Sequence, residues 1–306
     1  MRFVVIGAGG VGGYFGACLA RAGESVTFVA RGAHLRAIRA GGLRIRSTVD
    51  GEWVIRADAR EDLDREPPAD VVLLTVKSFD TEEALGVVTP VLGRETAVLS
   101  LQNGVDAIGR IDAALGPGRA LGGAAYVFAA IAEPGVIVHR FNKRIAFGEP
   151  DGRATARVER IRDAFTSAGV LVDVATDIRR VLWEKYVLIC AQAGMTALAR
   201  APIGVVRETP ETWRMYRLLL EELAAVGARD GVELPPDIVD RTVKAAEQLA
   251  PELTSSLHDD LVRGKKLELE ALQGHAVRLG EKYGVPTPML SAVYAALKPH
   301  VDGVRS

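Results

Sequence analysis

Residues 7–12, Gly-Ala-Gly-Gly-Val-Gly, have types and a spacing that could hold a pyrophosphate. In this G-x-G-x-x-G pattern the first glycine permits a tight turn, the second lets phosphates approach the backbone, and the third lets the following helix pack on the preceding strand. N–H groups at the start of that helix face the anion, whose charge the helix dipole stabilises. The residues expected to bind a dinucleotide here are Gly7, Ala8, Gly9, Gly10, Val11 and Gly12.

The residue after the second apolar run indicates which dinucleotide is bound. Apolar runs at residues 1–6 and 25–30 place the glycine turn at the first crossover of a βαβ unit. Where an NAD-specific site usually has an acidic residue, this chain has Arg31. A guanidinium can form a forked pair with a 2′-phosphate, which a carboxylate would repel. The sequence therefore favours NADPH over NADH, with a solvated arginine at a strand end as the alternative.

Lys185 is a candidate proton donor. It lies in the apolar stretch 181–190 of an expected helix, where partial desolvation would lower its pKa and let it donate a proton near neutral pH. The alternative is a surface lysine beside Glu184 that extends its ammonium into water. The residues alone leave both interpretations open.

Two further strands end in polar residues. Residues 69–76 form an apolar, β-branched run typical of a buried parallel strand, and Lys77 follows it. A strand over 96–101 is followed by Gln-Asn-Gly, which presents Asn103. The carboxyl ends of strands are where open α/β sheets bind ligands. Asn103 and the next glycine could also form only a turn.

The order of expected elements predicts an α/β fold with two domains. Strands and helices alternate through residues 1–176, which is typical of a Rossmann-type dinucleotide-binding domain, whereas residues 177–306 read as helices only. Asp177 is expected to cap the first of these helices. We expect the active site in the cleft between the domains.

Three local predictions concern irregular parts of the fold. Residues 43–46 and 52–56 are expected to form a small hairpin that decorates the sheet. Residues 136–140 and 144–148 are expected to form a second hairpin at the sheet edge. A single helix is expected over roughly 256–283.

Composition narrows the class of protein. The chain has 306 residues and a formal net charge of −1, from 38 basic and 39 acidic residues, so its overall charge favours neither nucleic acid nor an anionic membrane as partner. Its two cysteines, Cys18 and Cys190, have no metal-ligand spacing and read as core residues of a cytoplasmic protein. No metal site is expected. The apolar helices of the second domain are compatible with a homodimer.

Several motifs stand together in an order and approximate spacing that is more specific than any one of them. They are the glycine turn, Arg31, Thr75-Val-Lys77, Gln102-Asn-Gly104, Leu182-Trp-Glu-Lys185, Thr254-Ser-Ser256 and Glu268. In this ensemble the chain resembles the ketopantoate reductases (2-dehydropantoate 2-reductases) over nearly its whole length. The resemblance implies reduction of the 2-dehydropantoate ketone by NADPH, giving (R)-pantoate for the synthesis of pantothenate and coenzyme A.

The resemblance also implies roles for individual residues. Lys185 would be the general acid to the ketone oxygen, and Asn103 would orient the substrate next to the cofactor. Ser256 would bind the substrate carboxylate, and Arg31 with Lys77 would contact the cofactor phosphates.

Glu268 matches a functional glutamate of the family. If residues 256–268 form one unbroken helix, Ser256 and Glu268 are separated by roughly 18 Å, too far for one small keto acid to bridge. Glu268 is therefore expected to serve the nicotinamide ribose or to orient Lys185, as a catalytic and cofactor-binding residue. A solvent-facing glutamate in a charged run is the alternative.

One departure from the family pattern concerns the substrate. Many ketopantoate reductases have asparagines one and two turns after the lysine, where this chain has Ile189 and Ala193. Gln192 lies about 100° from the Ala193 direction on a helix, so it replaces them only if the helix is irregular. A more apolar 2-oxo acid is therefore an alternative substrate. A non-catalytic dinucleotide sensor, in which Lys185 is structural, is an alternative of another class.

Overall fold

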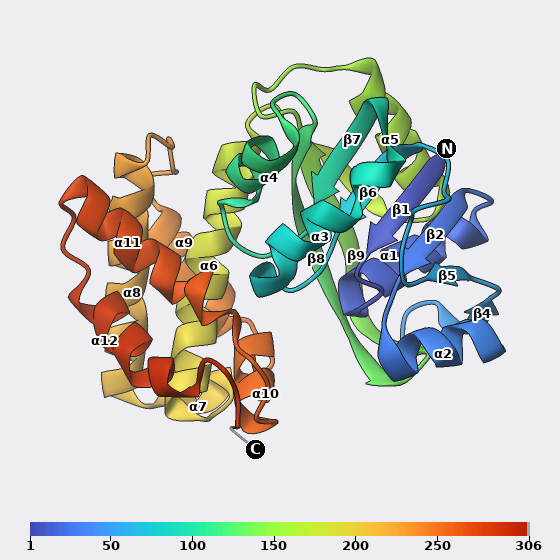
Figure 1. Cartoon of the computed structure of the whole chain (residues 1–306). Helices are drawn as coiled ribbons and strands as arrows, with labels where there is room; N and C mark the ends of the chain where they lie inside the picture. The colour runs from blue at the N-terminus through green and yellow to red at the C-terminus, as the bar shows by residue number, and fades with distance from the viewer. Residues whose placement is uncertain (305–306) are drawn as a thin grey trace. The chain divides into compact units, whose positions relative to one another are not determined.

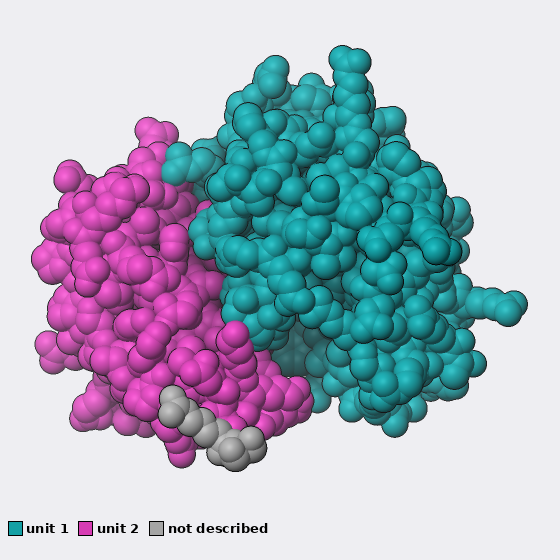
Figure 2. All heavy atoms as spheres, in the orientation of Figure 1, with its two compact units in different colours: residues 1–102, 106–181 teal, residues 103–105, 182–306 magenta. Residues whose placement is uncertain are grey.

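The computed structural model describes residues 1–304 and divides into two compact units. Residues 1–102 and 106–181 form the first unit, and residues 103–105 and 182–306 are grouped in the second (Figure 2).

The first unit is built on a mixed β-sheet. Within residues 1–304, ten strands form one sheet in the order β4-β3-β9-β8-β7-β6-β1-β2-β5, with β10 paired to β9 (Figure 1). The strands from β8 to β5 in this order are joined by parallel pairs, as repeated βα crossovers require. The strands are β1 (Arg2–Ile6), β2 (Ser25–Val29), β3 (Leu43–Ser47), β4 (Gly51–Ile55), β5 (Asp58–Arg60), β6 (Ala69–Leu74), β7 (Leu92–Ser100), β8 (Ala120–Glu133), β9 (Val136–Gly148) and β10 (Leu171–Val174).

Helices cover both faces of this sheet, and each face has its own hydrophobic core. Along β1, Phe3 and Val5 belong to one core and Val4 and Ile6 to the other, because successive strand residues point to opposite faces. Helices α1, α2 and α5 complete the first core, and α3 and α4 complete the second. The helices of the first unit are α1 (Gly10–Arg21), α2 (Gly32–Gly41), α3 (Thr81–Val87), α4 (Ala107–Leu115) and α5 (Ala156–Ser167), with 3₁₀ turns η1 (Ser78–Asp80) and η2 (Thr89–Val91).

The two hairpin predictions have different outcomes. The antiparallel pair β3–β4 confirms the hairpin expected over residues 43–56. The hairpin expected within 136–148 is wrong, because these residues form the single strand β9, which pairs with β8 and lies inside the sheet. The polar residues that suggested a turn form a bulge instead, with Asn142 at φ 60° and skipped in the pairing register.

The second unit contains helices and turns but no strand among its described residues. This confirms the fold class expected from the sequence, a Rossmann-type α/β domain followed by an all-α one. Helix α6 begins after Asp177, whose Oδ1 accepts a hydrogen bond from the Arg180 N–H at 3.0 Å, as the cap prediction required. The helices are α6 (Ile178–Ala199), α7 (Ile203–Glu208), α8 (Pro210–Arg229), α9 (Ile238–Glu247), α10 (Ser256–Val262), α11 (Gln273–Tyr283) and α12 (Pro288–Leu297), with 3₁₀ turns η3 (Glu268–Glu270) and η4 (Lys298–His300).

The single helix expected over 256–283 is wrong. Helix α10 ends at Val262, and Gly264 adopts a φ of 63°, which a helix cannot continue through. The Leu267 N–H then donates to the Val301 carbonyl at 2.8 Å, so the chain is extended before η3 begins. This breaks the segment between Ser256 and Glu268 into two short elements.

No helix among residues 1–304 is both long and apolar enough to cross a lipid bilayer.

Candidate active site

The glycine turn follows β1 and is fixed by backbone hydrogen bonds. Gly7 adopts a φ of 100°, which favours glycine. The N–H groups of Gly7 and Ala8 donate to the Val29 carbonyl at 3.3 and 3.2 Å. The Thr75 hydroxyl donates to the Gly7 carbonyl at 2.9 Å. The turn is therefore held by β2 and by the residue after β6, independently of any ligand.

The glycines of the turn differ in what a side chain would meet. A Cβ at Gly12 would lie 2.2 Å from the Thr75 hydroxyl oxygen, so close packing of helix on strand requires glycine, as expected. A Cβ at Gly10 would lie 2.1 Å from the Ala129 carbonyl oxygen, which is a packing requirement that the motif did not reveal. A Cβ at Gly9 would meet no protein atom within 4 Å. Protein packing therefore does not explain the glycine at position 9, where the sequence predicts the close approach of a pyrophosphate.

A hydrogen bond joins Ala8 of the glycine turn to the His34 ring. The Ala8 N–H is already engaged with β2, and its carbonyl lies 2.8 Å from His34 Nε2. His34 Nδ1 accepts from the Gly135 N–H at 3.0 Å, so Nε2 is the donor to Ala8. Burial lowers the pKa of His34, which keeps the ring neutral. The N–H groups left for an anion are those of the first turn of α1, which includes Val11.

Arg31 and Lys77 follow the carboxyl ends of β2 and β6. Arg31 is exposed, and its Nη2 donates to Oε1 of Glu83 on α3 at 2.7 Å. Lys77 is partly buried and immediately precedes η1. The partner of Arg31 was not foreseen, because Glu83 is 52 residues away in the chain.

Gln102 organises the loops at this edge of the sheet. Its Nε2 donates to the Val76 carbonyl at 3.0 Å and to the Thr81 hydroxyl at 2.8 Å, and its Oε1 accepts from Ser100 at 3.1 Å. The side chain is buried. Gln102 appeared in the sequence only as part of a motif, and its bonds fix the backbone on either side of Lys77.

Lys185 and Glu268 are brought together in the second unit. Lys185 is partly buried on α6, and burial lowers its pKa to about 8, while the charge of Glu268 acts in the opposite direction. The lowered pKa agrees with the first of the two interpretations that the apolar stretch left open. Glu268 begins η3 and is only 8% exposed, so the solvent-facing alternative for Glu268 is wrong.

The helix break changes the interpretation of Ser256. The estimate of roughly 18 Å to Glu268 rested on an unbroken helix, which the structure does not have. Ser256 is exposed in the first turn of α10, and Ser255 is the N-cap, whose hydroxyl accepts from the His258 N–H at 3.0 Å. Ser255 Oγ also lies 2.8 Å from Thr196 Oγ1 on α6, so α10 is tied to the helix that carries Lys185.

The remaining predicted residues are distributed as follows. Asn103 is partly buried and precedes Gly104, whose φ of 113° makes the pair a turn as well as a candidate contact. Ala193 is buried within the core of the helical unit, and Ile189 is partly buried and packs against that core. Gln192 is partly buried. The helix after Lys185 therefore carries apolar side chains at positions 189 and 193, both in contact with the core of the helical unit.

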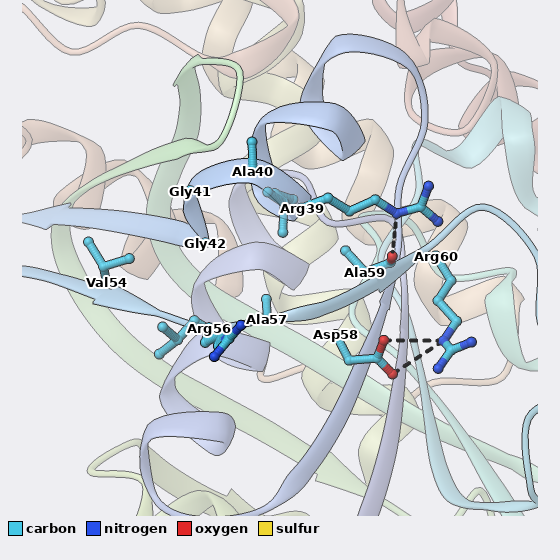
Figure 3. Close-up of a pocket in the computed structure, with 12 residues that line it drawn as sticks. Arg39, Ala40, Gly41, Gly42, Val54, Arg56, Ala57, Asp58, Ala59 and Arg60 are labelled. Atoms are coloured by element: carbon cyan, nitrogen blue, oxygen red, sulfur yellow. Dashed lines mark hydrogen bonds and ion pairs between the residues drawn. The ribbon is translucent and has the colours of Figure 1, made fainter.

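A surface hollow of about 680 Å³ lies in the first unit, beside α2, β4 and β5 (Figure 3). Two of its three arginines are engaged by the protein itself: Arg39 donates to the Ala59 carbonyl at 2.9 Å, and Arg60 donates to Asp58. No predicted site residue lines it.

The sheet order, the glycine turn and the fully helical second unit place the chain among the two-domain proteins of the Rossmann class. Residues 3–152 match the model of the family Ketopantoate reductase PanE/ApbA, and residues 177–301 match the model of its C-terminal part. The chain belongs to the ketopantoate reductase family, which confirms the resemblance stated above and makes it an oxidoreductase by family.

Relatives and solved structures agree with this assignment. The chain is 34% identical to a 2-dehydropantoate 2-reductase of Mesorhizobium japonicum, with 97% of each chain covered. It is 32% identical to a 2-dehydropantoate 2-reductase of Archaeoglobus fulgidus, with 100% of this chain and 98% of the other covered. A PanE/ApbA family ketopantoate reductase from Ralstonia eutropha superimposes with a TM-score of 0.91 at 33% identity, with 98% of each chain covered.

Proposed function

We propose that this chain catalyses the NADPH-dependent reduction of 2-dehydropantoate to (R)-pantoate, with Lys185 as general acid. The observation that carries the proposal is the Lys185–Glu268 pair, in which a partly buried ammonium has its pKa lowered to about 8. The family and the names of the relatives support the substrate class. Pantothenate biosynthesis in the cytoplasm is the corresponding role.

The residues of the chain divide the work of such a reaction. The reduced nicotinamide, when bound, supplies the hydride. Lys185 donates a proton from Nζ to the ketone oxygen, and a pKa near 8 leaves it largely protonated at pH 7 yet a better acid than an ordinary lysine, whose pKa is about 10.4. Glu268 holds a negative charge near that ammonium and keeps it protonated.

The other predicted residues bind and orient. Asn103 orients the ketone beside the cofactor, and the Ser256 hydroxyl donates a hydrogen bond to the substrate carboxylate. The first turn of α1, Arg31 and Lys77 bind the cofactor phosphates. In this proposal residues 1–176 hold the cofactor and residues 177–306 supply the acid.

A second candidate substrate is a more apolar 2-oxo acid. Ile189 and Ala193 offer no polar group to the hydroxyl of 2-dehydropantoate. A buried hydroxyl without a partner would weaken binding by about 1 to 3 kcal/mol. Either another segment or a water supplies that partner, or the enzyme prefers acids with apolar branched chains.

A panel of 2-oxo acids, followed by the absorbance of NADPH, separates these proposals. The panel contains 2-dehydropantoate and the same acid without its hydroxyl. Preference for the hydroxylated acid supports the first proposal, and preference for the deoxy acid supports the second. NADPH binding without turnover of any acid would instead indicate a dinucleotide sensor.

Substitution of the lysine tests its role. We expect Lys185→Met to lower kcat on the best substrate by at least about 100-fold, because a general acid typically contributes 10²- to 10⁴-fold. The Kd for NADPH, measured by fluorescence titration, should change little. Near-normal turnover of the variant would return Lys185 to a structural role.

A further inference from the structure

Two hydrogen bonds attach the segment that follows Glu268 to helix α6. The Tyr186 hydroxyl on α6 donates to the Leu272 carbonyl at 2.6 Å. In the opposite direction, Gln273 Nε2 donates to the Cys190 carbonyl of α6 at 2.7 Å. Both side chains are fully buried. Tyr186 and Cys190 are four residues apart, so the two bonds lie one turn from each other on the helix.

Glu270, within η3, connects the same segment to other helices of the unit. The Glu270 carboxylate accepts from the Tyr294 hydroxyl at 2.9 Å and from Arg278 at 2.8 Å, and it also pairs with Lys298. These three partners belong to α11, α12 and η4, not to α6. Glu270 therefore fixes η3 to the C-terminal helices, whereas Tyr186 and Gln273 attach the following residues to the helix of Lys185.

Resting on the proposed role of Lys185, we propose that Tyr186 is a positioning residue: its hydroxyl holds residues 268–272 on α6 and so keeps the Glu268 carboxylate against the Lys185 ammonium. Tyr186 is the next residue after Lys185, and Leu272 is one helical turn beyond Glu268. The Leu272 N–H also donates to the Glu268 carbonyl at 3.2 Å, so a backbone hydrogen bond links the residue that Tyr186 holds to Glu268.

The electrostatic consequence has a definite sign. Burial lowers the pKa of Lys185, and the negative charge of Glu268, on η3, raises it. If the Leu272 carbonyl loses its hydrogen bond from Tyr186, Glu268 moves and the electric field of its carboxylate at the Lys185 ammonium weakens. The pKa of Lys185 then falls below its value of about 8, and activity is lost at a lower pH on the alkaline side.

The test compares Tyr186→Phe, Glu268→Gln and the double variant. Tyr216→Phe is the matched control, because Tyr216 is also fully buried in the helical unit, and its hydroxyl has no hydrogen-bond partner among the described residues. The first readout is the pH dependence of reductive methylation at Lys185, followed by mass spectrometry in the absence of substrate. The second is the alkaline limb of kcat/KM.

We expect Glu268→Gln to lower the pKa of Lys185 by roughly 1 unit or more, and Tyr186→Phe to lower it by about 0.5 to 1 unit. The double variant should match Glu268→Gln, because the hydroxyl acts through the carboxylate. Tyr216→Phe should leave the limb in place. If Tyr186→Phe proves unstable, Gln273→Met removes the reciprocal bond and should shift the limb in the same direction.

Two results would count against these ideas in different ways. If Glu268→Gln shifts the alkaline limb of kcat/KM but Tyr186→Phe and Gln273→Met do not, the positioning role of Tyr186 is overturned and the general acid is not. A wild-type limb that neither Glu268→Gln nor Lys185→Met affects would instead overturn the proposed general acid.

Discussion

Arg31 and Glu83 form an ion pair where a 2′-phosphate is expected to bind. Their side chains are 56% and 60% exposed, so the pair adds little to stability in water. Its importance is chemical, because the carboxylate already occupies one donor of the guanidinium. A phosphate must share Arg31 with Glu83 or displace it.

Substitutions at these two positions should therefore act in opposite directions. We expect Arg31→Ala to lower the preference for NADPH over NADH by about 10- to 100-fold, since a charge-assisted hydrogen bond is worth on the order of 1.5 to 3 kcal/mol. Glu83→Gln should tighten the binding of NADPH severalfold and leave the affinity for NADH unchanged. Fluorescence titration of both cofactors measures these effects. A wild type that prefers NADH, or an Arg31→Ala variant with unchanged preference, would contradict the assignment of Arg31.

At the residue scale, the local sequence indicates whether the surroundings of a side chain are apolar or polar. It does not indicate which distant residue forms a hydrogen bond or an ion pair with that side chain. The apolar stretch around Lys185 allowed either a desolvated lysine with a lowered pKa or a surface lysine, and the burial of the side chain decides between them. The pairing of Glu83 with Arg31 and the bonds of Gln102 to Val76 and Thr81 depend on which loops the sheet brings together. No local pattern contains that information.

At the scale of elements, the glycine turn and α1 give a matched pair of substitutions. Gly12→Ala should destabilise the fold by about 1 to 3 kcal/mol, because its Cβ would overlap Thr75 and the Gly7 carbonyl. Gly9 has an extended backbone, φ −75° and ψ −162°, and a Cβ there meets no protein atom. Gly9→Ala should therefore leave the stability of the fold unchanged and weaken the binding of NADPH.

Urea unfolding and NADPH titration of both variants check this pair. Equal destabilisation by the two changes would mean that Gly9 is also a packing residue. Unchanged cofactor binding by Gly9→Ala would remove the pyrophosphate from this turn.

The elements that the sequence mispredicted are those whose local pattern competes with tertiary contacts. Asn142 has turn-forming character, yet β8 pairs with β9 on both sides of it, and Asn142 becomes the extra residue of a bulge. The charged run before Glu268 looks helical, but Gly264 and the contact of Leu267 with Val301 interrupt it. The β3–β4 hairpin, by contrast, follows from alternation alone.

At the scale of the whole molecule, cofactor binding should appear as a gain in stability. A ligand at 100 times its Kd stabilises the folded state by about 2.7 kcal/mol if it does not bind the unfolded chain. We expect NADPH to raise the Tm of the wild type and of Lys185→Met equally, and to raise that of Gly9→Ala less. Differential scanning fluorimetry with NADPH and NADH measures this. Loss of the shift in Lys185→Met would mean that the lysine serves cofactor binding.

The change from alternating strands and helices to helices alone is visible in the sequence near residue 176, because it follows from the period of the hydrophobic pattern. The grouping of residues 103–105 with the helical unit is not visible there. It depends on Val105 packing against a core whose other members begin at Trp183.

That grouping limits how this protein can be recombined with its relatives. The helical unit is not one continuous stretch, since the chain enters it at residue 103, leaves it after 105 and returns at 182. A chimaera made with a single crossover near residue 181 would combine one parent's helices with the other parent's residues 103–105. To exchange the helical unit intact, residues 103–105 must be transferred together with the residues from 182 onward.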